Sequence, residues 1–165
     1  MIHYQSTRGS RYIKTSAQAI IQGIAEDKGL YVPNEIPKLP FEIEDMIGKS
    51  YQEVAFRVLR AFFEDFTDEE MQACIDGAYD AKFEEEEIVP IVKAGDAHFL
   101  ELYHGKTAAF KDMALQILPH LLTTSVKISS CVGPKQNSLL WRSLNLISSG
   151  PYLLHLPDSS QSSFG

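Results

Sequence analysis

The sequence predicts an α/β chain in which a small, mostly helical domain (residues 1–82) precedes the beginning of an α/β domain (residues 88–126). Three observations lead to this prediction. Apolar residues recur at helical spacing in three segments before residue 80. Two strand-like segments follow, separated by a Gly-Asp turn, and after them comes a long amphipathic segment typical of a helix.

The first predicted helix begins at Ser16 and ends at Gly29, because apolar residues recur at helical spacing and glycine favours a left-handed C-terminal cap. Residues 32–40 are predicted as an extended connector, since each of their prolines disfavours helical backbone at the residue before it. The next two helices begin at the capping boxes Ser50-x-x-Glu53 and Thr67-x-x-Glu70.

The apolar faces of these two helices are interpreted as core and not as cofactor contacts. The predicted core residues are Val54, Val58, Leu59, Phe62 and Phe63 in one helix and Met71, Cys74, Ile75, Ala78 and Tyr79 in the other. The acidic run 84–87 is interpreted as a solvated connector. Residues 88–92 and 98–103 are then predicted strands around a Gly95-Asp96 turn, and residues 108–122 a helix.

Composition excludes several classes of protein. A net charge of −7 with no basic run argues against a nucleic-acid partner. The two cysteines, Cys74 and Cys131, make neither a disulfide framework nor a zinc site, so no metal is expected. The start lacks a secretory signal, and no run approaches the roughly 20 apolar residues that span a bilayer. We therefore expect a cytoplasmic protein with no membrane partner.

Lys111 is the candidate functional residue. It lies in the first turn of the predicted helix 108–122, where unpaired backbone N–H groups favour anions such as phosphate. An amine beside an anion site and next to Phe110 is suited to hold an aldehyde cofactor as a Schiff base. The alternative is an ordinary solvated lysine.

The sequence of this segment resembles a motif of a known family. Glu101-Leu102-Tyr103-His104-Gly105-x-Thr107-x-Ala109-Phe110-Lys111-Asp112 resembles the cofactor-lysine segment of threonine synthases, pyridoxal-phosphate (PLP) enzymes of fold type II. Tyr4-x-Ser6-Thr7-Arg8-Gly9 and Asp27-Lys28-Gly29-Leu30-Tyr31-Val32-Pro33, followed by Ile36-Pro37, resemble two earlier blocks of that family. The resemblance covers residues 2–126, with Lys106 where the family usually carries proline.

The resemblance implies a PLP-dependent carbon–oxygen lyase that converts O-phospho-L-homoserine and water to L-threonine and phosphate. Lys111 would be both the cofactor-binding and the catalytic residue, forming the internal imine and, once released, moving protons. Burial beside Phe110 would favour its neutral amine. The resemblance also implies that residues 88–126 are the truncated start of a fold-type II domain.

The roles of the neighbouring residues stay open at this point. Asp112 could cap its own helix or pair with a cation, and Thr107 could be the N-cap or a phosphate contact. His104 could be structural or could reach the active site, and Lys106 could be solvated or attract the substrate phosphate. Arg8 could bind a substrate anion or belong to a surface loop.

The remaining expectations concern completeness. Residues 127–165 contain ten serines, against five before them, which indicates a serine-rich tail, a disordered segment or a reading-frame shift near Lys127. No glycine-rich loop suits the cofactor phosphate, so we expect little or no activity from this chain alone. The alternative function is a non-catalytic domain or a partner-binding helical module between Val54 and Tyr79. The oligomeric state is left open.

Overall fold

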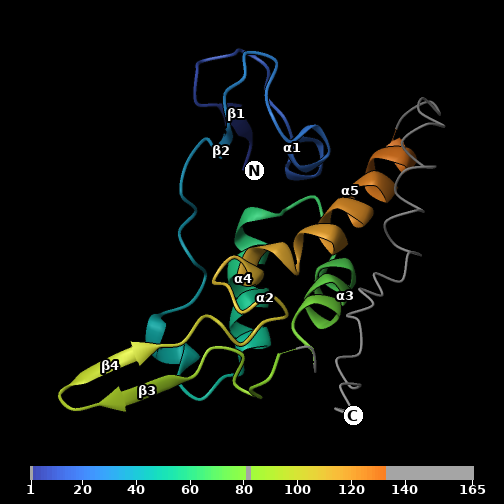
Figure 1. The fold of residues 1–165 in the computed structure, drawn as a ribbon. Helices are drawn as coiled ribbons and strands as arrows, with labels where there is room; N and C mark the ends of the chain where they lie inside the picture. Colours follow the sequence, from blue (N-terminus) through green and yellow to red (C-terminus); the bar gives the residue numbers. More distant parts are fainter. Residues whose placement is uncertain (1, 81–82, 133–165) are drawn as a thin grey trace, which may run out of the picture. The chain divides into compact units, whose positions relative to one another are not determined.

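The computed structural model describes residues 2–80 and 83–132, which are coloured in Figure 1. The elements, in chain order, are β1 (Tyr4–Ser6), α1 (Ser16–Gln22), β2 (Tyr31–Pro33), a 3-10 helix (Ile43–Met46), α2 (Tyr51–Phe62), α3 (Asp68–Ala78), β3 (Ile91–Ala94), β4 (Ala97–Leu100), α4 (Asp112–Leu115) and α5 (Leu118–Val132). The strands form two separate antiparallel pairs, β1 with β2 and β3 with β4. The described chain is therefore helical with two small sheets.

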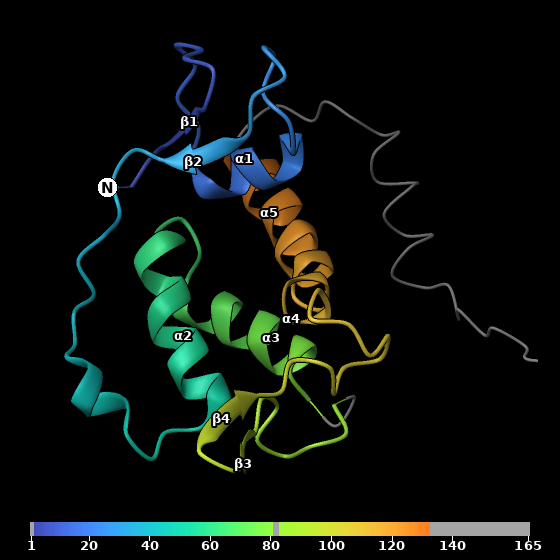
Figure 2. The same cartoon turned by 60° about the vertical axis from the view of Figure 1, so that its left-hand side comes forward.

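Strands β1 and β2 bring the two earlier motif blocks together, as Figure 2 shows. The Asp27 carboxylate joins them: its Oδ1 accepts hydrogen bonds from Ser6 Oγ (2.6 Å) and Gly29 N (2.9 Å), and its Oδ2 accepts one from Ser10 N (3.1 Å). A Cβ at position 29 would lie 2.0 Å from Ser6 Oγ. Glycine is therefore required there by the close approach of the first block to the second.

Helix α1 begins at Ser16, as predicted, but ends at Gln22 and not at Gly29. Its N-terminus is closed by a capping box between Thr15 and Gln18. The earlier end has a local cause, since Gly23 adopts a φ of 72° and donates its N–H to the carbonyl of Ala19.

Both predicted capping boxes are confirmed. Glu53 N donates to Ser50 Oγ at 3.2 Å before α2, and Glu70 N donates to Thr67 Oγ1 at 3.2 Å before α3. The predicted core face of α3 is confirmed in full, since all five of its residues are buried. Burial also raises the pKa of the Cys74 thiol, as expected for a small buried side chain.

The predicted face of α2 is only partly right. Leu59 and Phe63 pack against the core, as expected. The other α2 residues that do so are Tyr51, Ala55 and Phe56, where Val54, Val58 and Phe62 were expected. Residues 54, 58 and 62 form a stripe beside the one containing 51, 55, 59 and 63, so helical spacing allows either and packing against α3 selects one.

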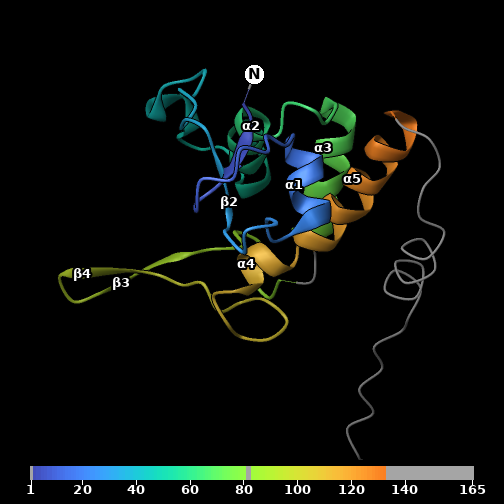
Figure 3. The same ribbon diagram turned by 90° about the horizontal axis from the view of Figure 1, so that it is seen from above.

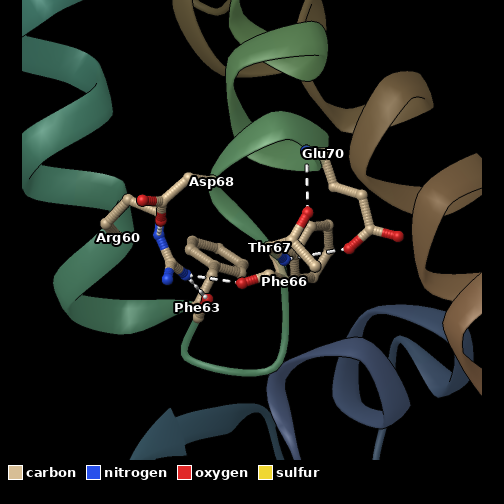
Figure 4. Close-up of polar contacts among 6 residues, drawn as sticks. All are labelled: Arg60, Phe63, Phe66, Thr67, Asp68 and Glu70. Atoms are coloured by element: carbon tan, nitrogen blue, oxygen red, sulfur yellow. Dashed lines mark hydrogen bonds and ion pairs between the residues drawn. The ribbon is translucent and has the colours of Figure 1, made fainter.

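Arg60 fixes the turn between α2 and α3 (Figure 4). Its Nε donates to Asp68 Oδ1 at 2.7 Å, and its Nη1 donates to the carbonyls of Phe63 (2.8 Å) and Phe66 (2.7 Å). Carbonyls at a helix C-terminus have no helical partner, so a guanidinium is well suited to satisfy them. Arg60 thus ties the end of α2 to the turn and to the first residue of α3.

The last helix completes the core. Helix α5 packs along both α1 and α3, as Figure 3 shows from above. Gly77 of α3 permits this crossing, because a Cβ there would lie 2.5 Å from the His120 ring. Helix α5 also continues through residues 127–132, the beginning of the predicted serine-rich tail. The rest of that tail, residues 133–165, lies outside the described residues.

Candidate active site

The β3–β4 hairpin leads into the segment that carries Lys111. Ile91 lies opposite Leu100, and the predicted turn at Gly95-Asp96 is confirmed, with φ of 62° at the glycine. The predicted strand boundaries are shifted, because Ile88 takes a φ of 65° and is buried in the core while the ladder begins at Ile91. Every residue of both strands is exposed. The hairpin thus delivers the chain to the site without contributing to the core.

The following segment, residues 104–111, is called here the Lys111 loop. Its end is closed by Asp112, which is 1% exposed. Asp112 Oδ2 accepts a hydrogen bond from Thr107 N and Asp112 Oδ1 accepts one from Thr107 Oγ1, both at 2.7 Å. A Cβ at Gly105 would lie 2.6 Å from Asp112, so the backbone of the loop passes directly over this carboxylate.

The expected helix over residues 108–122 is wrong. The chain instead forms a turn, the four-residue helix α4 and then α5. Two causes are local: Ala108 adopts a φ of 52° inside the closed loop, and Pro119 has no N–H to donate to the carbonyl of Leu115. The expected capping roles of Thr107 and Asp112 are also wrong, because the N-cap of α4 is Lys111 and its side chain makes no capping bond.

Lys111 is exposed, and Phe110 beside it is 66% exposed. The expected burial of the amine beside Phe110 is therefore wrong for the described residues. A four-residue helix also has too few aligned peptides to provide the anion site expected at its start. Lys106 is exposed on the same loop, so the loop presents two amines to solvent.

His104 lies at the start of the Lys111 loop and is 8% exposed. Its Nε2 lies 2.7 Å from Glu101 Oε2, and its ring stacks on Tyr103 with centroids 4.6 Å apart. The hydrogen bond to Glu101 raises the pKa of His104 and lowers the pKa of Glu101. Sequence reasoning did not single out Glu101, although its spacing of three residues from His104 was visible.

Arg8 lies in the region of β1 and β2, where it contacts the motif block that begins at Asp27. Its Nη1 donates to the carbonyl of Asp27 at 3.4 Å, and its side chain is exposed. This contact supports the surface-loop interpretation. The structure thus joins Thr107 to Asp112, the residue after Lys111, while the contact of His104 is with Glu101 and that of Arg8 is with Asp27.

The residues present fit one part of a PLP site. An exposed amine on a closed loop can react with an aldehyde. Among residues 2–80 and 83–132, no group of three or more His, Cys, Asp or Glu is placed to hold a metal ion. No helix in that part of the chain is long and apolar enough to cross a membrane.

The described residues form a helical N-terminal unit followed by a hairpin and a loop that carries Lys111, the order of elements expected at the beginning of a fold-type II PLP enzyme. Comparison with known proteins gives the family. Residues 3–79 match the family model described as the N terminus of threonine synthase. The chain is 37% identical over 124 residues to threonine synthase of Schizosaccharomyces pombe, which covers 73% of this chain and 24% of the relative.

Two solved structures agree. The PLP-bound threonine synthase from Brucella melitensis is 34% identical with a TM-score of 0.70, covering 77% of this chain and 28% of the other. The yeast threonine synthase is 31% identical with a TM-score of 0.68, and the match covers 82% of this chain and 28% of the yeast chain. The chain is therefore similar to the N-terminal portion of the threonine synthases. It spans about a quarter of the length of the curated relatives that it matches.

Proposed function

We propose that this chain supplies the N-terminal portion of a PLP-dependent threonine synthase, with Lys111 as the residue that holds the cofactor. The observation that carries the proposal is the placement of Lys111: its exposed amine lies at the end of a loop closed by the Thr107–Asp112 hydrogen bonds. The PLP-bound relative from Brucella melitensis supports the choice of cofactor.

The proposed reaction converts O-phospho-L-homoserine and water to L-threonine and phosphate, as a carbon–oxygen lyase acting on phosphate. When bound, PLP supplies the electron sink for carbanion chemistry. Within this chain, Lys111 Nζ would hold the cofactor covalently and move protons, while Asp112 keeps the backbone before it closed. The division into residues 1–82 and 88–126 stays a proposal, as does the cytoplasmic location.

We expect little or no threonine synthase activity from the chain alone. The described residues provide an amine, but the sequence contains no glycine-rich loop for the cofactor phosphate. A productive site needs these supporting groups held in place as well as the reacting group. The proposal therefore concerns attachment at Lys111 and not turnover by this polypeptide.

Site-selective labelling tests the proposal. The protein is mixed with PLP below one equivalent, reduced with borohydride and digested, and the pyridoxyl group is located by mass spectrometry. We expect Lys111 to be labelled in clear excess over Lys106, the matched exposed lysine on the same loop. Lys111→Ala should remove this preference and Lys106→Ala should leave it. Equal labelling of the two lysines in a folded protein would refute the proposal and favour the non-catalytic helical module.

A further inference from the structure

The Glu101–His104 contact holds the start of the Lys111 loop. Glu101 Oε2 is a hydrogen-bond acceptor 2.7 Å from His104 Nε2, so that nitrogen carries a proton. The other ring nitrogen, Nδ1, is buried, makes no hydrogen bond to the residues described, and lies 3.8 Å from Glu84 Oε2. The shortest polar contact that fixes the direction of the ring is therefore the one to Glu101, and the Tyr103 ring packs beside it.

The backbones of Glu101 and His104 join three segments. The carbonyl of His104 accepts a hydrogen bond of 3.0 Å from Glu84 N, which lies in the acidic connector after α3. Glu101 N donates to the carbonyl of Pro90 at 3.0 Å, which ties the end of the hairpin to its beginning. Glu101 and His104 together thus link the connector, the hairpin and the loop.

Gly105, the residue after His104, connects the start of the loop to the region of Lys111. Gly105 passes so close to Asp112 that a single added carbon would lie 2.6 Å from its Cβ and Oδ2. Any displacement of His104 moves Gly105, and hence the position of Asp112 and of Lys111 before it. Because Asp112 closes the loop at its other end, both ends of the Lys111 loop are fixed by side chains.

We propose that Glu101 and His104 are a positioning pair that directs the Lys111 amine. The ring contact fixes the start of the loop, and the Thr107–Asp112 contact fixes its end. The effect on cofactor attachment rests on the proposed function of Lys111, whereas the effect on loop order does not. Glu101 and His104 are positioning residues, since they act through the loop backbone.

The test compares His104→Ala with His104→Gln, whose amide N–H can still reach Glu101. Two readouts are used: hydrogen exchange of the Thr107 and Ala108 amides, and the ratio of Lys111 to Lys106 labelling. Loss of a hydrogen bond to a charged group should speed loop exchange about tenfold and lower the labelling ratio toward one. His104→Gln should restore both values. His98→Ala, an exposed histidine on β4, is the matched control and should change neither.

The outcomes separate this inference from the proposed function. Wild-type protein that labels both lysines equally refutes the role of Lys111, and loop exchange then still decides the role of the pair. Loop exchange in His104→Ala equal to wild type overturns the inference, and so does a Gln variant no better than the Ala variant. Should His104→Ala fail to fold, Glu101→Ala compared with Glu101→Gln applies the same two readouts from the other side of the contact.

Discussion

Replacement of Asp112 by alanine tests whether its carboxylate closes the Lys111 loop. The substitution removes two hydrogen bonds of 2.7 Å to Thr107, one from its N–H and one from its hydroxyl. A hydrogen bond to a charged group contributes about 1.5–3 kcal/mol. Because Thr107 is exposed, water can satisfy its freed donors. We therefore expect the free energy that favours the closed loop to fall by about 2–4 kcal/mol.

Asparagine at the same position separates charge from shape. The side chain introduced by Asp112→Asn has nearly the same volume as the native one, but it offers one acceptor oxygen where two donors are waiting. We therefore expect Asp112→Asn to reduce the free energy of loop closure by about 1–2 kcal/mol, which lies between wild type and Asp112→Ala. The matched control is Asp96→Asn in the hairpin turn, where the residue is exposed and asparagine suits the backbone equally well.

Hydrogen exchange measures the effect directly. The Thr107 amide should exchange about 30-fold faster or more in Asp112→Ala, since 1.4 kcal/mol corresponds to a factor of about ten. Urea unfolding, followed in parallel, reports whether the core helices keep their stability. An exchange rate for Thr107 within about threefold of wild type, corresponding to well under 1 kcal/mol, would refute the view that Asp112 holds this loop.

Three further predictions follow from the same structure. Gly105→Ala should lower the free energy of unfolding by about 1–3 kcal/mol, because its Cβ would overlap Asp112; an unchanged urea midpoint would contradict the close approach. The pKa of His104 is raised by Glu101, with Glu85 and Glu84 adding to the shift, so its stabilisation is complete below its unfolded pKa of about 6.5 and is lost as pH rises through its folded pKa. An NMR titration midpoint at or below about 6.5 would show that this contact is absent. Ile75→Ala, at a fully buried position, should lower the free energy of unfolding by about 2–5 kcal/mol, while Ile36→Ala, at a position 85% exposed, should change it by no more than about 0.5 kcal/mol. Comparable losses in the two variants would show that the core does not lie around Ile75.

The features that the sequence predicted correctly depend on contacts within a few residues. The capping boxes at Ser50 and Thr67 join a side chain to a backbone group three positions away. The turn at Gly95 needs only the backbone freedom of glycine. The apolar face of α3 is a single stripe with no competing neighbour, so helical spacing alone identifies it.

The features that the sequence did not determine depend on segments far apart in the chain. Gly29 is required because Ser6 approaches it, and the core face of α2 is selected by α3. The end of α1 was missed for another reason, since two glycines could each close that helix and only the backbone of Gly23 shows which one does.

The site shows the same division. The motif made Lys111 the candidate residue, but it predicted neither the exposure of Lys111 nor the closure of its loop by Asp112. A periodic apolar pattern predicted one helix over residues 108–122. Instead, the buried Asp112 carboxylate binds Thr107 in the preceding loop, and Pro119 interrupts the helical hydrogen bonds between α4 and α5. Such closure depends on where the loop backbone lies in three dimensions, and hydrophobic spacing carries no information about that.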